Sequence, residues 1–258
     1  MTARPSSLAL VALLVGVAGC GGTQLAARPA PQVPPSVTAR GQTVYFGTVF
    51  PLKTEAPKPS FIYERRVDER DGAFVSIHIT REPSGGIAIA EAATHSADYA
   101  LSEYTLHGNQ LGQTGTIRVE NDRVFFHFVD GASDSSHVEH QTGAVVVGPT
   151  LVGYIVRHLG ALQAGDVIGV RLAVLDRLET IGFDLQAASA QPGQTQVKMT
   201  ASSFVISLIV DPLFFTFETA TGKLVRLEGR VPPKVRDGAS WQDFDARVEY
   251  QFVADAYR

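Results

Sequence analysis

Apolar and polar residues alternate with a period of two along most of this 258-residue chain. The alternation is clear from Val75 to Thr80, from Ile181 to Gln186 and from Phe244 to Phe252. Successive side chains of a β-strand point to opposite faces, so this period indicates strands with one buried face and one solvent-facing face. The pattern therefore predicts a protein built mainly from antiparallel sheet.

Turn sequences between these segments predict how the strands pair. Asn121-Asp122 separates two apolar runs and predicts a two-residue hairpin, because both residues tolerate a positive φ. The sequence from Thr219 to Gly222 predicts a second hairpin. Between Leu101 and Tyr104 the alternation slips by one residue, which indicates a β-bulge. Strands that follow one another in the sequence are thus expected to be neighbours in the sheet.

One segment has the pattern of a helix. Pro149 suits a first helical position and Gly165 suits the residue after a helix end, so the sequence predicts a helix over residues 149–164. Its apolar stripe consists of Leu151, Ile155, Leu159 and Leu162. We interpret His158 as a helix-end histidine favoured by the helix dipole, in preference to a catalytic base. Residues 202–210 fit both a helix and a strand, and we favour a helix.

These elements predict a mainly β fold of the α+β class, with a strongly twisted antiparallel sheet or open half-barrel packed on one main helix. We expect a single β-rich domain over residues 44–258. It would contain an N-terminal meander over residues 61–130, the helix, and C-terminal strands over residues 166–253. The net charge of −4 gives no basic surface for nucleic acid, so none is expected as a partner.

The first twenty residues have the parts of an export signal. Arg4 precedes an apolar run from Leu8 to Val17, and Ala18-Gly19 precedes Cys20, the only cysteine of the chain. This pattern resembles the bacterial lipoprotein signal. The resemblance implies that residues 1–19 are removed and that acyl chains on Cys20 anchor the protein to a membrane. The alternative is an ordinary secretory signal followed by a chance cysteine.

Residues 20–43 are predicted to be the lipidated N-terminus and a tether, because prolines stand at positions 29, 31, 34 and 35 with no apolar periodicity. Gly21 follows the cysteine, where an aspartate in the enterobacterial lipoproteins implies retention at the inner membrane. The resemblance therefore implies an outer-membrane protein that faces the periplasm.

A polar segment from Asp130 to Gln141 is predicted to be a loop. It contains the candidate metal ligands of this sequence. His137 and His140 are spaced by three residues and have carboxylates nearby. A solvated loop rich in serine and aspartate has the same composition, and we favour that interpretation. No metal and no cofactor are therefore expected.

The second half of the sequence, from Gly148 to the closing strand, looks like uncharacterised bacterial envelope proteins with a long, curved antiparallel sheet. It is also similar in pattern to the Lol lipoprotein carriers. This resemblance concerns architecture, and it implies a half-barrel that wraps helices and holds acyl chains.

The same half carries more large apolar side chains than one helix stripe can cover, which predicts an apolar ligand site. The candidate binding residues are Tyr154, Phe183, Phe215 and Phe217. No catalytic residue is expected, because the sequence has no Gly-x-Ser-x-Gly elbow, no His-Glu-x-x-His helix and no phosphate-binding glycine loop. We expect a non-catalytic module that binds a hydrophobic ligand. The alternatives are an assembly-scaffold lipoprotein and, less favoured, a hydrolase-type enzyme.

Overall fold

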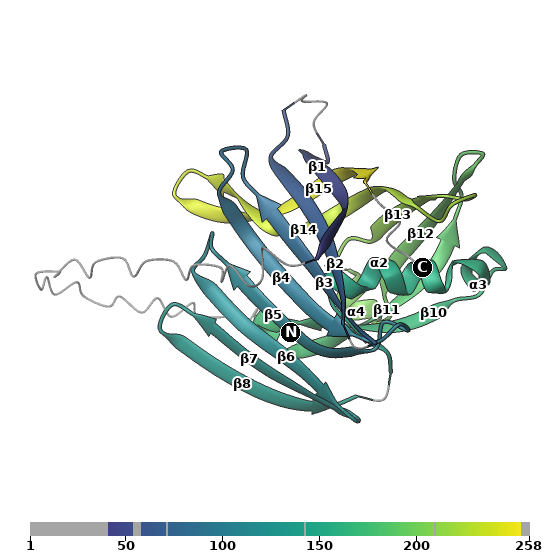
Figure 1. Ribbon diagram of the computed structural model, residues 1–258. Coiled ribbons are helices and arrows are strands. Elements are labelled where there is room, and N and C mark those ends of the chain that lie inside the picture. The colour runs from purple at the N-terminus through teal and green to yellow at the C-terminus, as the bar shows by residue number, and fades with distance from the viewer. Residues whose placement is uncertain (1–40, 54–57, 71, 142, 209, 254–258) are drawn as a thin grey trace, which may run out of the picture.

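The computed structural model describes residues 41–53, 58–70, 72–141, 143–208 and 210–253 (Figure 1). The predicted signal peptide, Cys20 and nearly all of the tether lie outside the described residues. In the described part, strands predominate, and the helices are few and short. None of those helices is long and apolar enough to cross a membrane.

The strands and helices have the following bounds. The strands are β1 (Gln42–Pro51), β2 (Phe61–Arg70), β3 (Ala73–Arg81), β4 (Ile87–His95), β5 (Leu101–Gly108), β6 (Gln113–Glu120), β7 (Arg123–Asp130), β8 (Ser133–His140), β9 (Val145–Val146), β10 (Ile168–Val174), β11 (Glu179–Ala188), β12 (Gln194–Ala201), β13 (Leu213–Glu218), β14 (Leu224–Asp237) and β15 (Ser240–Phe252). The helices are α2 (Gly148–Arg157), α3 (Leu159–Gln163), α4 (Phe204–Ser207) and the 3-10 helix η1 (Leu175–Arg177).

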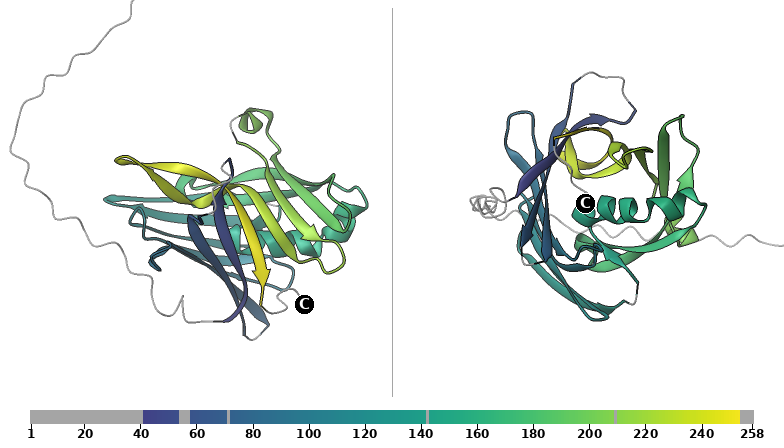
Figure 2. Two further views of the ribbon diagram at one scale, coloured as in Figure 1. Left: turned by 90° about the horizontal axis from the view of Figure 1, so that it is seen from above. Right: turned by 45° about the vertical axis from the view of Figure 1, so that its right-hand side comes forward.

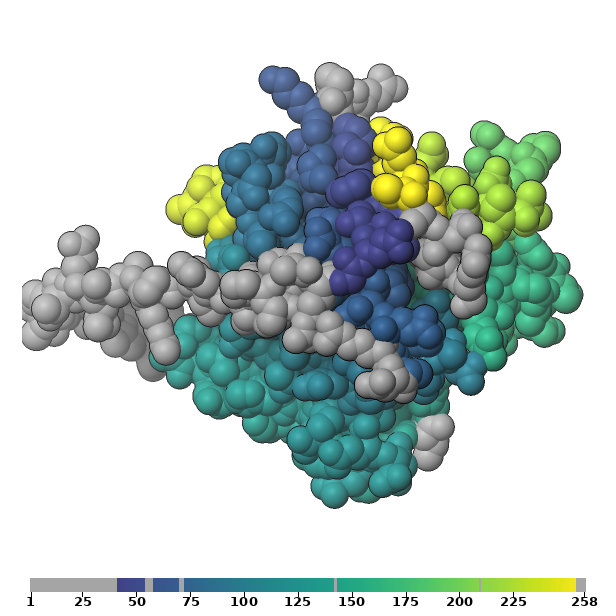
Figure 3. Space-filling model, viewed as in Figure 1, coloured from purple at the N-terminus to yellow at the C-terminus, as the bar shows by residue number. Residues whose placement is uncertain are grey.

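Within the described residues the fifteen strands form one sheet, and all neighbours are antiparallel except β9 and β10. Strands β1 to β8 follow one another across one half, and β10 to β15 return across the other. The halves meet where β1 pairs with β15, and Figure 3 shows the yellow C-terminal strand beside the purple β1. The prediction of a mainly β protein with a large antiparallel sheet is therefore confirmed.

The sheet curves strongly, and its two ends approach each other. In the right-hand view of Figure 2, α2 lies inside the curve of the sheet. The main-chain N–H of Thr180, on β11, donates to Glu139 Oε2 of β8 at 3.0 Å. Leu175 of η1 is buried together with Phe126 and Phe128 of β7. Side chains near the ends of the strand order thus hold the curved sheet together.

The largest apolar core lies between the helices and the second half of the sheet. The buried stripe of α2 and α3 packs with inward-facing residues of β10 to β13, among them Val170, Leu185, Met199 and Phe215. Because a curved sheet directs alternate side chains toward its concave face, residues from several strands reach the same helices.

Several local predictions are confirmed. Asn121 has a φ of 56° in the turn between β6 and β7, where Glu120 pairs with Arg123. Gly222 lies in the turn between β13 and β14, and Gly165 has a φ of 101° after α3. The register of β4 and β5 is irregular at Leu101, as the slipped alternation indicates.

Other predictions are wrong in extent or type. The segment from Asp130 to Gln141 is mostly the strand β8, which pairs with β7 alone. Its side chains are polar because it is an edge strand, and polar edge strands resist pairing with other chains. The expected helix over residues 149–164 is two helices, because the backbone of His158, with φ −100° and ψ 6°, leaves the helical conformation between them. His158 Nδ1 lies 2.9 Å from the carbonyl oxygen of Tyr154. Among the described residues of the 202–210 segment, which omit residue 209, Phe204–Ser207 are helical and the rest are not.

Candidate functional site

A buried polar cluster crosses β2, β3, β4 and β5 on the concave face of the sheet. Arg65 of β2 pairs with His78 of β3, and His78 pairs with Glu91 of β4. Directly opposed residues on adjacent strands point to the same face, so these three side chains form a row. Each is at most 5% exposed, which is rare for ionisable groups without a structural or functional reason.

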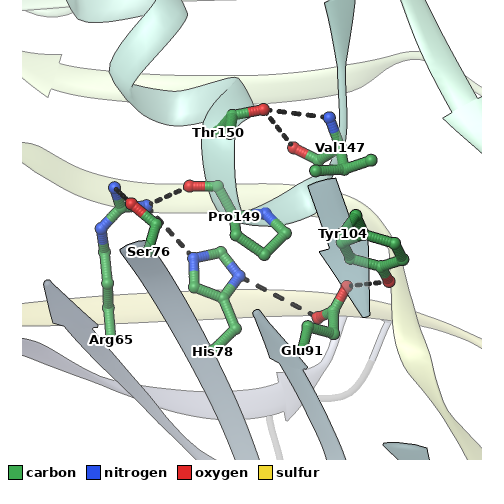
Figure 4. A network of polar contacts seen from close by, with 8 residues as sticks. All are labelled: Arg65, Ser76, His78, Glu91, Tyr104, Val147, Pro149 and Thr150. Atoms are coloured by element: carbon green, nitrogen blue, oxygen red, sulfur yellow. Dashed lines mark hydrogen bonds and ion pairs between the residues drawn. The ribbon is translucent and has the colours of Figure 1, made fainter. Parts of the chain in front are cut away.

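Arg65 connects the sheet to the first turn of α2 (Figure 4). Its Nη1 donates to the carbonyl oxygen of Pro149 at 2.7 Å, and its Nη2 donates to Ser76 Oγ at 3.0 Å. Nη1 also lies 3.2 Å from His78 Nε2. A guanidinium group can only donate, so Nε2 of His78 accepts and the ring proton is on Nδ1.

Glu91 lies on the other side of His78 and beneath the start of α2. Tyr104 donates its hydroxyl proton to Glu91 Oε1 at 2.8 Å, and Glu91 Oε2 lies 4.0 Å from His78 Nδ1 (Figure 4). A Cβ added to Gly148 would lie 3.2 Å from Glu91 Oε1, so glycine allows the helix to begin this close. Burial raises the pKa of Glu91 to about 7, and the hydrogen bond from Tyr104 opposes that rise.

A second branch of the cluster leads from Arg65 through Ser76 to His95. Ser76 Oγ lies 2.9 Å from His95 Nε2, and His95 Nδ1 lies 2.7 Å from the carbonyl oxygen of Ser96. The carbonyl can only accept, so Nδ1 carries the proton and Ser76 donates to Nε2. Burial lowers the pKa of His95 and lowers that of His78 well below its usual value. Both imidazoles are therefore neutral at pH 7.

This second branch borders a small pocket with a volume of about 30 Å³. A cavity that holds one water needs a volume of about 10 to 15 Å³, so two waters or one carboxylate-sized group would fit in this pocket. The ring of Tyr99 stacks on that of His95 at 4.9 Å between centroids. The pocket is lined by Arg65, Val67, Phe74, Ser76, His95, Ala97 and Tyr99. It therefore combines a cation and a hydroxyl with apolar walls.

The residues predicted from the sequence lie elsewhere. Tyr154, Phe183, Phe215 and Phe217 belong to one buried cluster, the core between α2 and the second half of the sheet. His140 Nδ1 lies 3.2 Å from Asp122 Oδ2 on the exposed surface, and His137 lies opposite Phe126 in the β7–β8 ladder. Within the described ranges no three histidine, cysteine, aspartate or glutamate residues are grouped closely enough to hold a metal.

Sequence reasoning missed the polar cluster. One signal was present: Glu91 interrupts the apolar stretch from Ile87 to Ala93, and a charged residue in such a stretch needs a buried partner. The signal for Arg65 was weaker. It occupies the alternating position between Tyr63 and Val67, but Glu64 and Arg66 flank it and give the segment the composition of a polar strand end.

Comparisons with known proteins yield a likeness of structure and none of sequence family. No protein-family model and no curated protein matches the sequence. The fold is similar to a β-barrel-like protein of the domain of unknown function DUF1849 from Brucella abortus, with a TM-score of 0.47. The two are 8% identical, and the match covers 85% of this chain and 99% of the other. At this identity the likeness does not extend to function.

The raised pKa of Glu91 predicts a pH-dependent stability. The folded protein keeps a proton on Glu91 up to about pH 7, whereas the unfolded chain loses it near pH 4.5. The stabilisation from this carboxyl is complete below pH 4.5, declines as the pH rises, and is lost above about pH 7. Glu91→Gln should therefore gain stability relative to wild type between pH 5 and pH 8, by about 3 kcal/mol.

Urea unfolding of both proteins across this range measures the difference. His78 and His95 make the free energy of unfolding change with pH in the opposite direction to Glu91. Both histidines are present in the variant and in wild type, so their contribution largely cancels in the difference between the two proteins. Glu103→Gln, on the exposed side of β5, is the matched control and should show a difference that does not change with pH. A similarly constant difference for Glu91→Gln would contradict the prediction.

Proposed function

We propose that this protein is a lipid-anchored, non-catalytic binding protein of the bacterial envelope. In this proposal Cys20 carries the acyl chains, the domain faces the periplasm from the outer membrane, and the curved sheet acts as an open half-barrel with α2 as its main packed helix. The ligand is a hydrophobic acid whose carboxylate occupies the pocket beside Arg65.

The proposal rests on the lining of that pocket. Arg65 supplies a planar donor group suited to a carboxylate, and the Ser76 hydroxyl lies beside it. Val67 and Phe74 supply an apolar wall along which the start of an acyl tail can lie. A longer tail would reach the aromatic residues Tyr154, Phe183, Phe215 and Phe217 only if α2 moved away from the sheet.

The anchor is tested in the native host. Cys20→Ala should move the protein from the membrane fraction to the soluble fraction and remove the mass of the acyl chains. Each buried CH₂ contributes about 0.8 kcal/mol, so loss of several chains abolishes stable binding. Gly22→Ala, outside the signal, is the control and should stay in the membrane. Unchanged mass and location of the Cys20→Ala protein would refute the anchor.

Ligand binding is tested with residues 21–258, which retain the whole described sheet and need no detergent. A fluorescent fatty acid should bind, and Ala97→Trp should weaken its binding at least tenfold, or about 1.4 kcal/mol, because the new ring covers the pocket. Ala100→Trp is the matched control: Ala100 is also exposed in the same turn but does not line the pocket.

A fatty alcohol of equal chain length separates the head-group contribution from the tail. It should compete at least tenfold less well than the acid, because it lacks the carboxylate that Arg65 would bind. Equal competition would refute the role of Arg65. If neither compound binds, the scaffold alternative gains support, and turnover of a fatty ester that depends on Ser76 would favour the hydrolase alternative.

A further inference from the structure

A short apolar turn stands out from the sheet between β12 and β13. Phe204, Val205 and Leu208 are 76%, 70% and 69% exposed. In the left view of Figure 2 the green segment that contains α4 projects from the body of the sheet. Large apolar side chains gathered on one projecting turn usually mark a surface that meets an apolar partner.

The turn is held in a defined conformation. Ile206 points inward and packs against the large apolar core, so its neighbours point outward. The N–H of Ser207 donates to the carbonyl oxygen of Ser203 at 2.9 Å. The hydroxyl of Ser207 donates to the carbonyl oxygen of Phe204 at 2.8 Å. The N–H of Val210 donates to the carbonyl oxygen of Ile206 at 2.9 Å. These main-chain groups are thus paired within the turn, as entry into an apolar medium requires.

The chemistry of the turn fits the interface of a lipid bilayer. The sequence from Met199 to Val210 contains no charged residue and no histidine. A stable protein interface buries about 1,000 Å² or more and has matched polar groups around its rim. Three side chains on a convex turn provide neither this area nor such a rim. A bilayer needs no shape complementarity, and a few apolar side chains can insert into its interfacial region.

We propose that Phe204, Val205 and Leu208 insert into the bilayer that carries the acyl chains of Cys20, and so fix the orientation of the domain on the membrane. This inference rests on the proposed lipid anchor. Residues 21–40 can span about 60 Å at ~3.1 Å per residue, so the anchored domain can bring the turn to the same membrane. Because the anchor holds the domain near the membrane, this second contact is intramolecular, and a low affinity of the turn for the bilayer is enough to keep it inserted.

The test uses the full-length protein purified from membranes and reconstituted in phosphatidylethanolamine–phosphatidylglycerol vesicles. Trp241, the only tryptophan, is replaced by phenylalanine, and Phe204→Trp is added as a reporter. Val167→Trp in the same background is the control, because Val167 is exposed and apolar but lies outside α4. In the Phe204→Trp protein we expect a blue shift of the tryptophan emission and its quenching by a lipid labelled near the head group. The Val167→Trp protein should show neither change.

Three results would overturn the inference: no quenching in the Phe204→Trp protein, equal quenching in both reporter proteins, or a blue shift in the Phe204→Trp protein that appears without vesicles as protein concentration rises. The last would assign the turn to contact between copies. The mass of the Cys20 peptide is measured on the same sample, so failure of the anchor is recognised separately. If Cys20 is unmodified, the same protein is mixed with added vesicles, and quenching still reports on the turn.

Discussion

Arg65→Ala is expected to lower the free energy of unfolding by about 4 kcal/mol, a large part of the roughly 5 to 15 kcal/mol that holds an ordinary domain folded. The substitution removes a buried side chain and leaves a cavity, which alone costs a few kcal/mol. It also removes hydrogen bonds to the Pro149 carbonyl, Ser76 and His78, and leaves these groups buried without that donor. The substitution also removes the cost of burying the charged guanidinium group, which offsets part of this loss of stability.

Urea unfolding at pH 7 measures the effect. Arg118→Ala on β6 is the matched control, because Arg118 is mostly exposed and pairs with Glu120 on the surface. Such pairs contribute about 0 to 1 kcal/mol, so the control should differ little from wild type. If the two variants unfold at the same urea concentration, the Arg65 contacts do not hold α2 to the sheet.

The local pattern of the fold could be predicted because its causes are local. Period-two alternation follows from strand geometry, and the Asn121-Asp122 hairpin follows from the φ angles of two residues. The pairing of β1 with β15 has no such signature, since it joins residues about two hundred positions apart. The edge strand β8 escaped prediction because it lacks the apolar face on which the alternation depends.

Apart from the signal at Glu91, the candidate site could not be predicted because of how the sheet curves. In the alternation of β3, Ser76 and His78 have the pattern of the solvent-facing side of a strand whose buried side carries Ile77 and Ile79. In the structure all four are buried. Ser76 and His78 lie on the concave face of the sheet, which wraps around α2 (Figure 2). The polar residues of such a strand are interior, and they must then find partners on neighbouring strands and on the helix.

Helix α2 also packs closely against Tyr99, at the position of Gly153. Gly153→Ala in α2 is expected to destabilise the protein by about 2 to 3 kcal/mol, although alanine is the better helix former by about 1 kcal/mol. A Cβ at this position would overlap the ring of Tyr99 and lie 2.5 Å from its hydroxyl oxygen. Tyr99 cannot move aside freely, because its ring stacks on His95 and its backbone has a φ of 60°.

Gly160→Ala in α3 separates the clash from helix propensity. A Cβ there would have no atom within 4 Å, so this variant should be more stable than wild type by up to about 1 kcal/mol. Thermal unfolding of the two variants should therefore give shifts of opposite sign. Adding Tyr99→Ala to Gly153→Ala should recover part of the loss, since neighbouring changes that share one clash are not additive. Equal shifts for Gly153→Ala and Gly160→Ala would show that α2 does not pack this closely on the turn before β5.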